Sequence, residues 1–171
     1  AIGLMAKTSN EKAGGNSQTA VGAASSADGE AASAFGANAN ATGSTATAIG
    51  RAAKALAQSA SALGDSASAS AWGATALGTG ASARANNSIA VGSAAVTEGQ
   101  ESTALGRRSY AGAQSATALG TLANASAVVS TAVGNGAKAS ALGASSLGNG
   151  ADASGRGSMA LGYASKASGV D

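Results

Sequence analysis

A dipeptide of one apolar residue followed by glycine returns every 14 residues over most of this 171-residue chain. The glycines of this repeat are Gly22, Gly36, Gly50, Gly64, Gly78, Gly92, Gly106, Gly120, Gly134, Gly148 and Gly162. The residue two places before the glycine is alanine in ten of the eleven units, and the residue three places before it is Thr or Ser in nine. A disordered chain has no reason to keep such a register, so the period predicts a repeat architecture.

A unit of 14 residues is too short for a helix pair or a propeller blade. It accommodates two strands of about five residues and two tight turns, which make one coil of a parallel β-solenoid. Positions in each unit are numbered from its repeat glycine, so that −1 precedes the glycine and +1 follows it. The glycine itself is expected where the strand turns or where a neighbouring coil approaches closely.

The first predicted strand of each coil alternates between small and polar positions. Positions +3, +5 and +7 are nearly all small, as in Ala81 and Ala83, whereas +4 and +6 carry polar and charged residues such as Lys54. This period of two predicts small side chains inside the coil and polar ones outside. Gly43 and Gly99 replace alanine at +7, which indicates a need for a small residue rather than for a positive φ.

Large apolar side chains are too few for an ordinary globular core. Alanine supplies 50 residues, glycine 26 and serine 26, whereas Leu, Ile, Val and Phe together supply 21. An interior of interlocked large side chains is therefore excluded. A thin coil, in which opposed layers of alanine pack closely, needs far less apolar volume, and we expect the alanines of the second strand to face inward.

The second predicted strand, from −4 to −1, contains no charged residue in any unit. A strand without charges on either face is normally buried on both faces. Its apolar column belongs either to the core or to an interface between chains, since in water it would be a continuous apolar stripe. We expect Phe35 and Ile49 to be core, and a parallel bundle of identical solenoids to bury the rest. The column is Val21, Phe35, Ile49, Leu63, Leu77, Val91, Leu105, Leu119, Val133, Leu147 and Leu161.

The whole chain, residues 1–171, is predicted to be one repetitive domain. Gly3 and Gly22 are separated by 19 residues, so the first coil is irregular and carries an insertion at about residues 7–16. Regular repeats occupy residues 17–171. The chain stops part-way through a repeat, and we expect it to be a fragment of a longer protein.

Most enzyme chemistry is excluded by composition. The chain contains no histidine and no cysteine, which removes the imidazole base, the thiolate nucleophile and the usual zinc ligands. We therefore expect no catalytic residue, no metal, no cofactor and no enzyme activity. The net charge of +2 is spread thinly, without the basic stripe that nucleic acid requires. A left-handed β-helix acyltransferase is disfavoured by the 14-residue period, and an ice-binding solenoid by the lack of a threonine ladder at −5.

Four residues stand out as possible ligand contacts. Trp72, the only tryptophan, lies at +8, where an exposed aromatic ring would act as a binding hot spot or cover the edge of the next coil. Arg107, Arg108 and Tyr110 form the densest basic and aromatic cluster. This cluster would receive an anionic ligand or a sulfated glycan, or else form a solvated turn.

The repeat resembles the head repeat of the trimeric autotransporter adhesins of the Yersinia adhesin type. The resemblance rests on units such as Thr47-Ala48-Ile49-Gly50 and Asn87-Ser88-Ile89-Ala90-Val91-Gly92, together with their 14-residue spacing. It covers residues 17–171 closely and 1–16 loosely. The frequent Thr or Ser at −3 departs from the family pattern, in which valine is common, and prevents a direct transfer of ligand specificity.

The resemblance implies a left-handed parallel β-roll that assembles as a parallel homotrimer. It also implies a surface adhesin of a Gram-negative bacterium that attaches to host cells or to matrix proteins such as collagen, fibronectin or laminin. The family's outer-membrane anchor is expected in a C-terminal region outside this sequence. The alternative function is a purely structural spacer that projects a binding tip located elsewhere.

Overall fold

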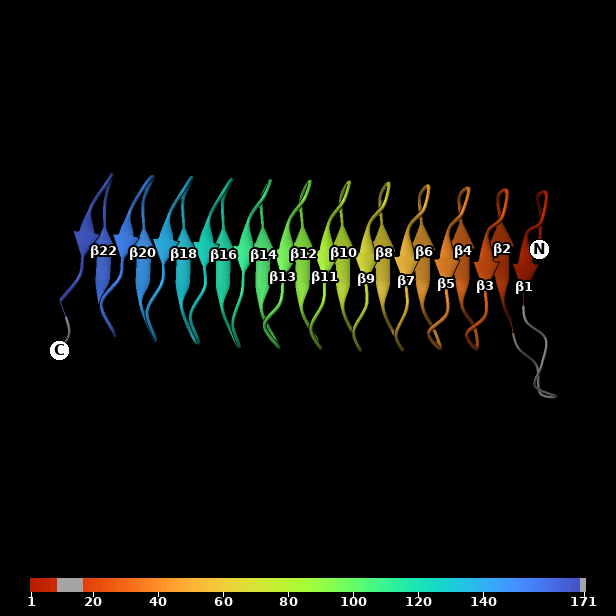
Figure 1. Cartoon of the computed structure of the whole chain (residues 1–171), viewed down its shortest axis with the longest axis horizontal. Coiled ribbons are helices and arrows are strands. Elements are labelled where there is room, and N and C mark those ends of the chain that lie inside the picture. The colour runs from red at the N-terminus through yellow and green to blue at the C-terminus, as the bar shows by residue number, and fades with distance from the viewer. Residues whose placement is uncertain (9–16, 170–171) are drawn as a thin grey trace.

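The computed structural model describes residues 1–8 and 17–169. It contains two β-sheets, each made of parallel strands, which run side by side along one axis (Figure 1). The chain alternates between an eleven-stranded sheet and a twelve-stranded sheet, and each coil adds one strand to each sheet. The described residues contain only strands, turns and irregular segments, and no helix among them is long and apolar enough to cross a membrane. The predicted all-β parallel solenoid is confirmed.

Strands of the eleven-stranded sheet have three residues each, at positions −3 to −1. They are β2 Thr19–Val21, β4 Ser33–Phe35, β6 Thr47–Ile49, β8 Ser61–Leu63, β10 Thr75–Leu77, β12 Ile89–Val91, β14 Thr103–Leu105, β16 Thr117–Leu119, β18 Thr131–Val133, β20 Ser145–Leu147 and β22 Met159–Leu161.

Strands of the twelve-stranded sheet have two residues each, at positions +4 and +5. They are β1 Lys7–Thr8, β3 Ser26–Ala27, β5 Asn40–Ala41, β7 Lys54–Ala55, β9 Ser68–Ala69, β11 Ser82–Ala83, β13 Val96–Thr97, β15 Tyr110–Ala111, β17 Asn124–Ala125, β19 Lys138–Ala139, β21 Asp152–Ala153 and β23 Lys166–Ala167.

Both kinds of strand are shorter than the predicted five residues, because two four-residue turns occupy more than half of each coil. In one turn the N–H of Ser109 donates to the carbonyl of Gly106 at 3.2 Å, and in the other the N–H of Ser102 donates to the carbonyl of Gly99 at 3.2 Å. These bonds between residues i and i+3 define β-turns. Only three residues remain on each side of the coil.

Equivalent residues stack directly above one another along the rod. In the pairing of β10 with β12, for example, Thr75 lies beside Ile89 and Leu77 beside Val91. The strand spacing of about 4.8 Å is therefore also the rise of one coil. Every position of the repeat consequently forms a column, and a ladder of like side chains follows from the sequence period.

The first coil keeps this register despite its extra residues. Lys7 and Thr8 form β1 and pair with Ser26 and Ala27, so these two residues belong to a strand and not to the insertion. The remainder of the predicted insertion, residues 9–16, lies outside the described residues.

The interior of the coil is made almost entirely of alanine. Positions −4, −2, +3 and +5 point inward, and the largest fully buried side chain in the described residues is Thr97. Its hydroxyl donates to Ser88 across the interior at 2.8 Å, so this buried polar group is paired. The predicted inward orientation of the −2 alanines, such as Ala76, is confirmed by their complete burial.

The repeat glycine meets two separate requirements. Gly78 has a φ of +130°, which side chains rarely adopt, and a Cβ at this position would lie 2.7 Å from the carbonyl oxygen of Gly92 in the next coil. Both expectations for this glycine are therefore confirmed. At +7, by contrast, Gly43 and Gly99 lack a positive φ, and an added Cβ would meet the backbone of the next coil, as expected for a close-packed position.

Candidate functional site

The apolar column at −1 lies on the outer face of the eleven-stranded sheet. Phe35 is 38% exposed, Ile49 40% and Leu105 43%, and Leu161 on the last coil is 71% exposed. The expectation that Phe35 and Ile49 are core is wrong for the single chain. Side chains alternate across a strand, and the −2 alanine already occupies the inward-facing position. Of the two predicted locations, only an interface between chains would bury this column.

The outward face also carries the −3 column, which consists mainly of threonine and serine. Two apolar exceptions, Ile89 and Met159, are 42% and 66% exposed and widen the apolar stripe. Ile2 extends it at the other end, because it bridges to Val21 and is 70% exposed. Ile2 is not among the residues of the predicted column, although its Ile2-Gly3 dipeptide carries the same signal as the eleven others.

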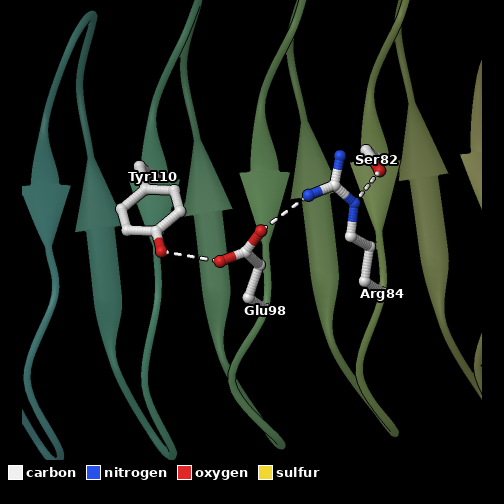
Figure 2. Close-up of polar contacts among 4 residues, drawn as sticks. All are labelled: Ser82, Arg84, Glu98 and Tyr110. Atoms are coloured by element: carbon white, nitrogen blue, oxygen red, sulfur yellow. Dashed lines mark hydrogen bonds and ion pairs between the residues drawn. The ribbon is translucent and has the colours of Figure 1, made fainter.

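Three coils of the twelve-stranded sheet share a polar ladder on their outer surface (Figure 2). The Arg84 guanidinium contacts the Glu98 carboxylate at 2.6 Å, and the Tyr110 hydroxyl donates to the other carboxylate oxygen at 2.7 Å. Arg84 also donates to the Ser82 hydroxyl at 3.1 Å. Gly112 leaves the space that the Tyr110 ring occupies, since a Cβ there would overlap the ring.

Hydrogen bonding in this ladder shifts the pKa values of both partners. The Tyr110 hydroxyl lowers the pKa of the Glu98 carboxyl, with a smaller contribution in the same direction from Arg84. The bond to Glu98 in turn raises the pKa of the Tyr110 phenol. The hydrogen bond therefore favours the ionised carboxylate of Glu98 and the protonated hydroxyl of Tyr110.

Tyr110 differs in its contacts from Arg107 and Arg108, with which it is predicted to form one cluster. Its hydroxyl is held by Glu98, whereas Arg107 and Arg108 are exposed and make no side-chain hydrogen bond or ion pair within the described residues. Arg51 differs, because Asp65 lies in the same column one coil later and pairs with it at 2.8 Å.

Trp72 lies at the other turn of the coil and is 50% exposed. Its backbone N–H donates to the side-chain oxygen of Asn86 at 3.2 Å. The four residues singled out from the sequence therefore do not form one site, since they are distributed over two turn edges and the twelve-stranded sheet. Within the part of the chain that the structure describes, no three His, Cys, Asp or Glu side chains form a group that could hold a metal ion.

Comparison with known protein families agrees with this geometry. The family model for the YadA head domain repeat, in two copies, matches residues 41–67, 55–81, 69–95, 83–109, 98–123, 111–137, 125–151 and 153–171. A search of curated proteins found no match. The matched family consists of adhesin head domains rather than enzymes, and it implies a surface-exposed autotransporter anchored in the outer membrane. Both the 14-residue coils and the family match extend over most of the chain, which therefore belongs to the YadA head domain family.

Proposed function

We propose that this chain is the head of a trimeric surface adhesin that attaches a Gram-negative bacterium to host cells or to matrix proteins. The observation that carries the proposal is the exposed apolar stripe on the eleven-stranded sheet of a chain from an adhesin family. An apolar stripe that continues from coil to coil differs from the single, scattered apolar residues that monomeric soluble proteins normally expose. Packing against other copies of the chain would remove it from water.

Three parallel copies are the assembly that we propose, with the −1 column in or beside the contact between chains. Identical coils would then lie at the same height in each chain, so every surface residue would appear three times around the rod. Weak contacts to a repetitive ligand, such as a collagen fibre, would add through multivalency. No single deep pocket is required for such attachment.

Adhesion of the chain itself tests this function against the spacer alternative. Beads that carry the purified protein would be applied to immobilised collagen, fibronectin and laminin and to host cell layers. Retention on at least one of these surfaces, with loss of retention for a variant that no longer self-associates, is the expected result. Beads that bind none of the surfaces, although the protein on them is folded and trimeric, would leave the chain as a spacer.

A further inference from the structure

One turn edge of the rod carries a row of side-chain amides around the single tryptophan. Position +8 is amide or tryptophan in five successive coils, and all five side chains are exposed. We call this row the amide edge. It consists of Gln58, Trp72, Asn86, Gln100 and Gln114.

Backbone hydrogen bonds hold the amide edge in register. The carbonyl of each +8 residue accepts the N–H of the +9 residue one coil later, at 2.9–3.0 Å throughout the row, as from Asn87 to Trp72. The side chains therefore project from a rigid frame at intervals of about 4.8 Å. A ligand that binds along the row would not need to order a loop.

The amides themselves remain available for a ligand. Gln58, Gln100 and Gln114 make no side-chain hydrogen bond to another described residue. Asn86 uses only its oxygen, which accepts the N–H of Trp72, so its two donors remain free. Stacked amides in parallel sheets commonly bond to one another, and the absence of such bonds among these described residues leaves donors and acceptors directed to solvent.

The chemistry of the row matches a sugar better than a protein or an anion. A hydroxyl group both donates and accepts, as an amide does, and the flat Trp72 ring offers a large apolar face for one sugar ring. No charged residue occupies +8 between Gln58 and Gln114, so an anionic ligand would gain no ion pair in this row. Protein interfaces surround their aromatic anchors with further apolar contacts, which the row lacks.

We propose that the amide edge binds an extended, uncharged oligosaccharide, with Trp72 stacked on one sugar ring and the amides bonded to hydroxyls in the coils on either side. The proposal rests on the adhesin function proposed above and names a ligand class for it, a neutral glycan chain of the host surface. One sugar contact per coil, repeated on three chains, would give useful avidity from weak individual sites.

Fluorescence of Trp72 tests the proposal directly, because the chain contains no other tryptophan. The assembled protein would be titrated with neutral hexasaccharides of N-acetyllactosamine, chitin and cellulose, and with a heparin hexasaccharide as the charged comparison. A saturable change in emission with at least one neutral glycan, and a smaller one with heparin, is expected. A response to heparin alone, or to none of the four, would overturn the proposal.

Two substitutions locate the effect on the amide edge. Gln100→Ala should weaken binding of the responsive glycan about three- to tenfold, as for the loss of one hydrogen bond. Asn149→Ala removes an exposed amide at the other turn and should leave binding unchanged. Equal effects of the two variants would contradict the assignment.

Failure of this site is distinguishable from failure of the adhesin function. Trp72→Ala should lose attachment to a surface coated with the responsive glycan, whereas Tyr163→Ala, which removes an exposed aromatic from the other turn, should not. A Trp72→Ala protein that attaches to that surface as well as the parent does would refute the amide edge and leave adhesion itself standing.

Discussion

Each coil has a positive φ at the repeat glycine and at two further turn positions, +2 and +9, and sixteen of the described residues at +2 and +9 are not glycine. A left-handed backbone costs an ordinary residue about 1–2 kcal/mol. Thr45 and Val129 are β-branched, for which this conformation is a true outlier. The coil keeps them there because hydrogen bonds to both neighbouring coils determine the turn, whatever residue occupies it.

Replacing the most unfavourable of these residues should stabilise the rod. Val129 has a φ of +56° and is 57% exposed, so Val129→Gly relieves strain and loses little burial. Relief of the backbone strain stabilises the folded chain, and the greater flexibility of glycine in the unfolded chain offsets part of this gain. The free energy of unfolding should therefore rise by about 0.5–1 kcal/mol per chain. The measurement is urea unfolding at one fixed protein concentration.

Val128 supplies the matched control for that substitution. It is adjacent to Val129, is 41% exposed and lacks a positive φ. Val128→Gly should therefore lower stability by about 0.5–1 kcal/mol. If both glycine variants shifted stability in the same direction, backbone strain at Val129 would not be the cause.

The two glycines of a single turn should respond very differently to alanine. Gly78→Ala combines a φ of +130° with a Cβ 2.7 Å from a carbonyl oxygen of the next coil, so we expect a loss of at least about 3 kcal/mol. Gly80→Ala has open space around its Cβ and a φ of +65°, and should cost about 1 kcal/mol. Thermal melts of both variants would show which one loses more stability. If the close approach between coils matters, Gly78→Ala must melt at the lower temperature.

At the scale of elements, the turn position +1 and position +6, just after each short strand, carry charge pairs that the sequence shows only once the coil length is known. Arg51 with Asp65, and Arg84 with Glu98, lie 14 residues apart and meet because each occupies one column. The Tyr110 contact could not be predicted, because it crosses between columns +4 and +6. It depends on Gly112, whose missing side chain leaves room for the ring.

The pH dependence of this ladder has a definite sign. Because the folded pKa of Glu98 is lowered, its contribution to stability is present above the ordinary carboxyl pKa and is lost as pH falls through the folded value. The pKa of Tyr110 is raised, so its contribution is present below the ordinary tyrosine pKa and is lost as pH rises through the folded value. Both windows lie outside neutral pH.

Removing the Tyr110 hydroxyl should move the pKa of Glu98. We expect Tyr110→Phe to raise this pKa toward its ordinary value, because the hydrogen bond that favours the carboxylate is lost. Carbon-13 NMR of the labelled Glu98 carboxyl, followed with pH, measures the change. Tyr163→Phe is the control, and an equal shift in that protein would exclude the direct bond as the cause.

The sequence predicted the architecture better than the site. Period, parallel pairing and the inward alanine column all follow from the 14-residue register, because every coil repeats the same requirement. The side chains that lie on the outer face of the coil could not be identified from this register. Phe35 is predicted to be core because large apolar side chains normally are, but here the largest fully buried side chain among the described residues is that of Thr97.

At the scale of the whole molecule, the chain has its largest apolar side chains on its outside. Full burial of a leucine side chain contributes about 1.5–3 kcal/mol, more than an alanine column can supply per residue. The alanine interior therefore determines the shape of the coil. The −1 column is proposed to supply much of the stability when chains associate with one another. Stability should consequently depend on protein concentration.

Charges placed in the column should separate the chains. The double variant Leu105→Asp and Leu119→Asp places two carboxylates in adjacent coils of the stripe, where burial would leave them unpaired. We expect a shift to single chains and a loss of thermal stability. Leu122→Asp together with Leu142→Asp introduces the same charges at exposed turn positions and should leave the assembly intact.

The mass of the unmodified protein in dilute solution tests the central claim most directly. Sedimentation equilibrium, with far-UV circular dichroism on the same sample, should give a β-rich particle of three times the 15.6 kDa chain mass. A stable β-rich particle of 15.6 kDa would contradict the account, because the exposed column would then be satisfied in water without a partner.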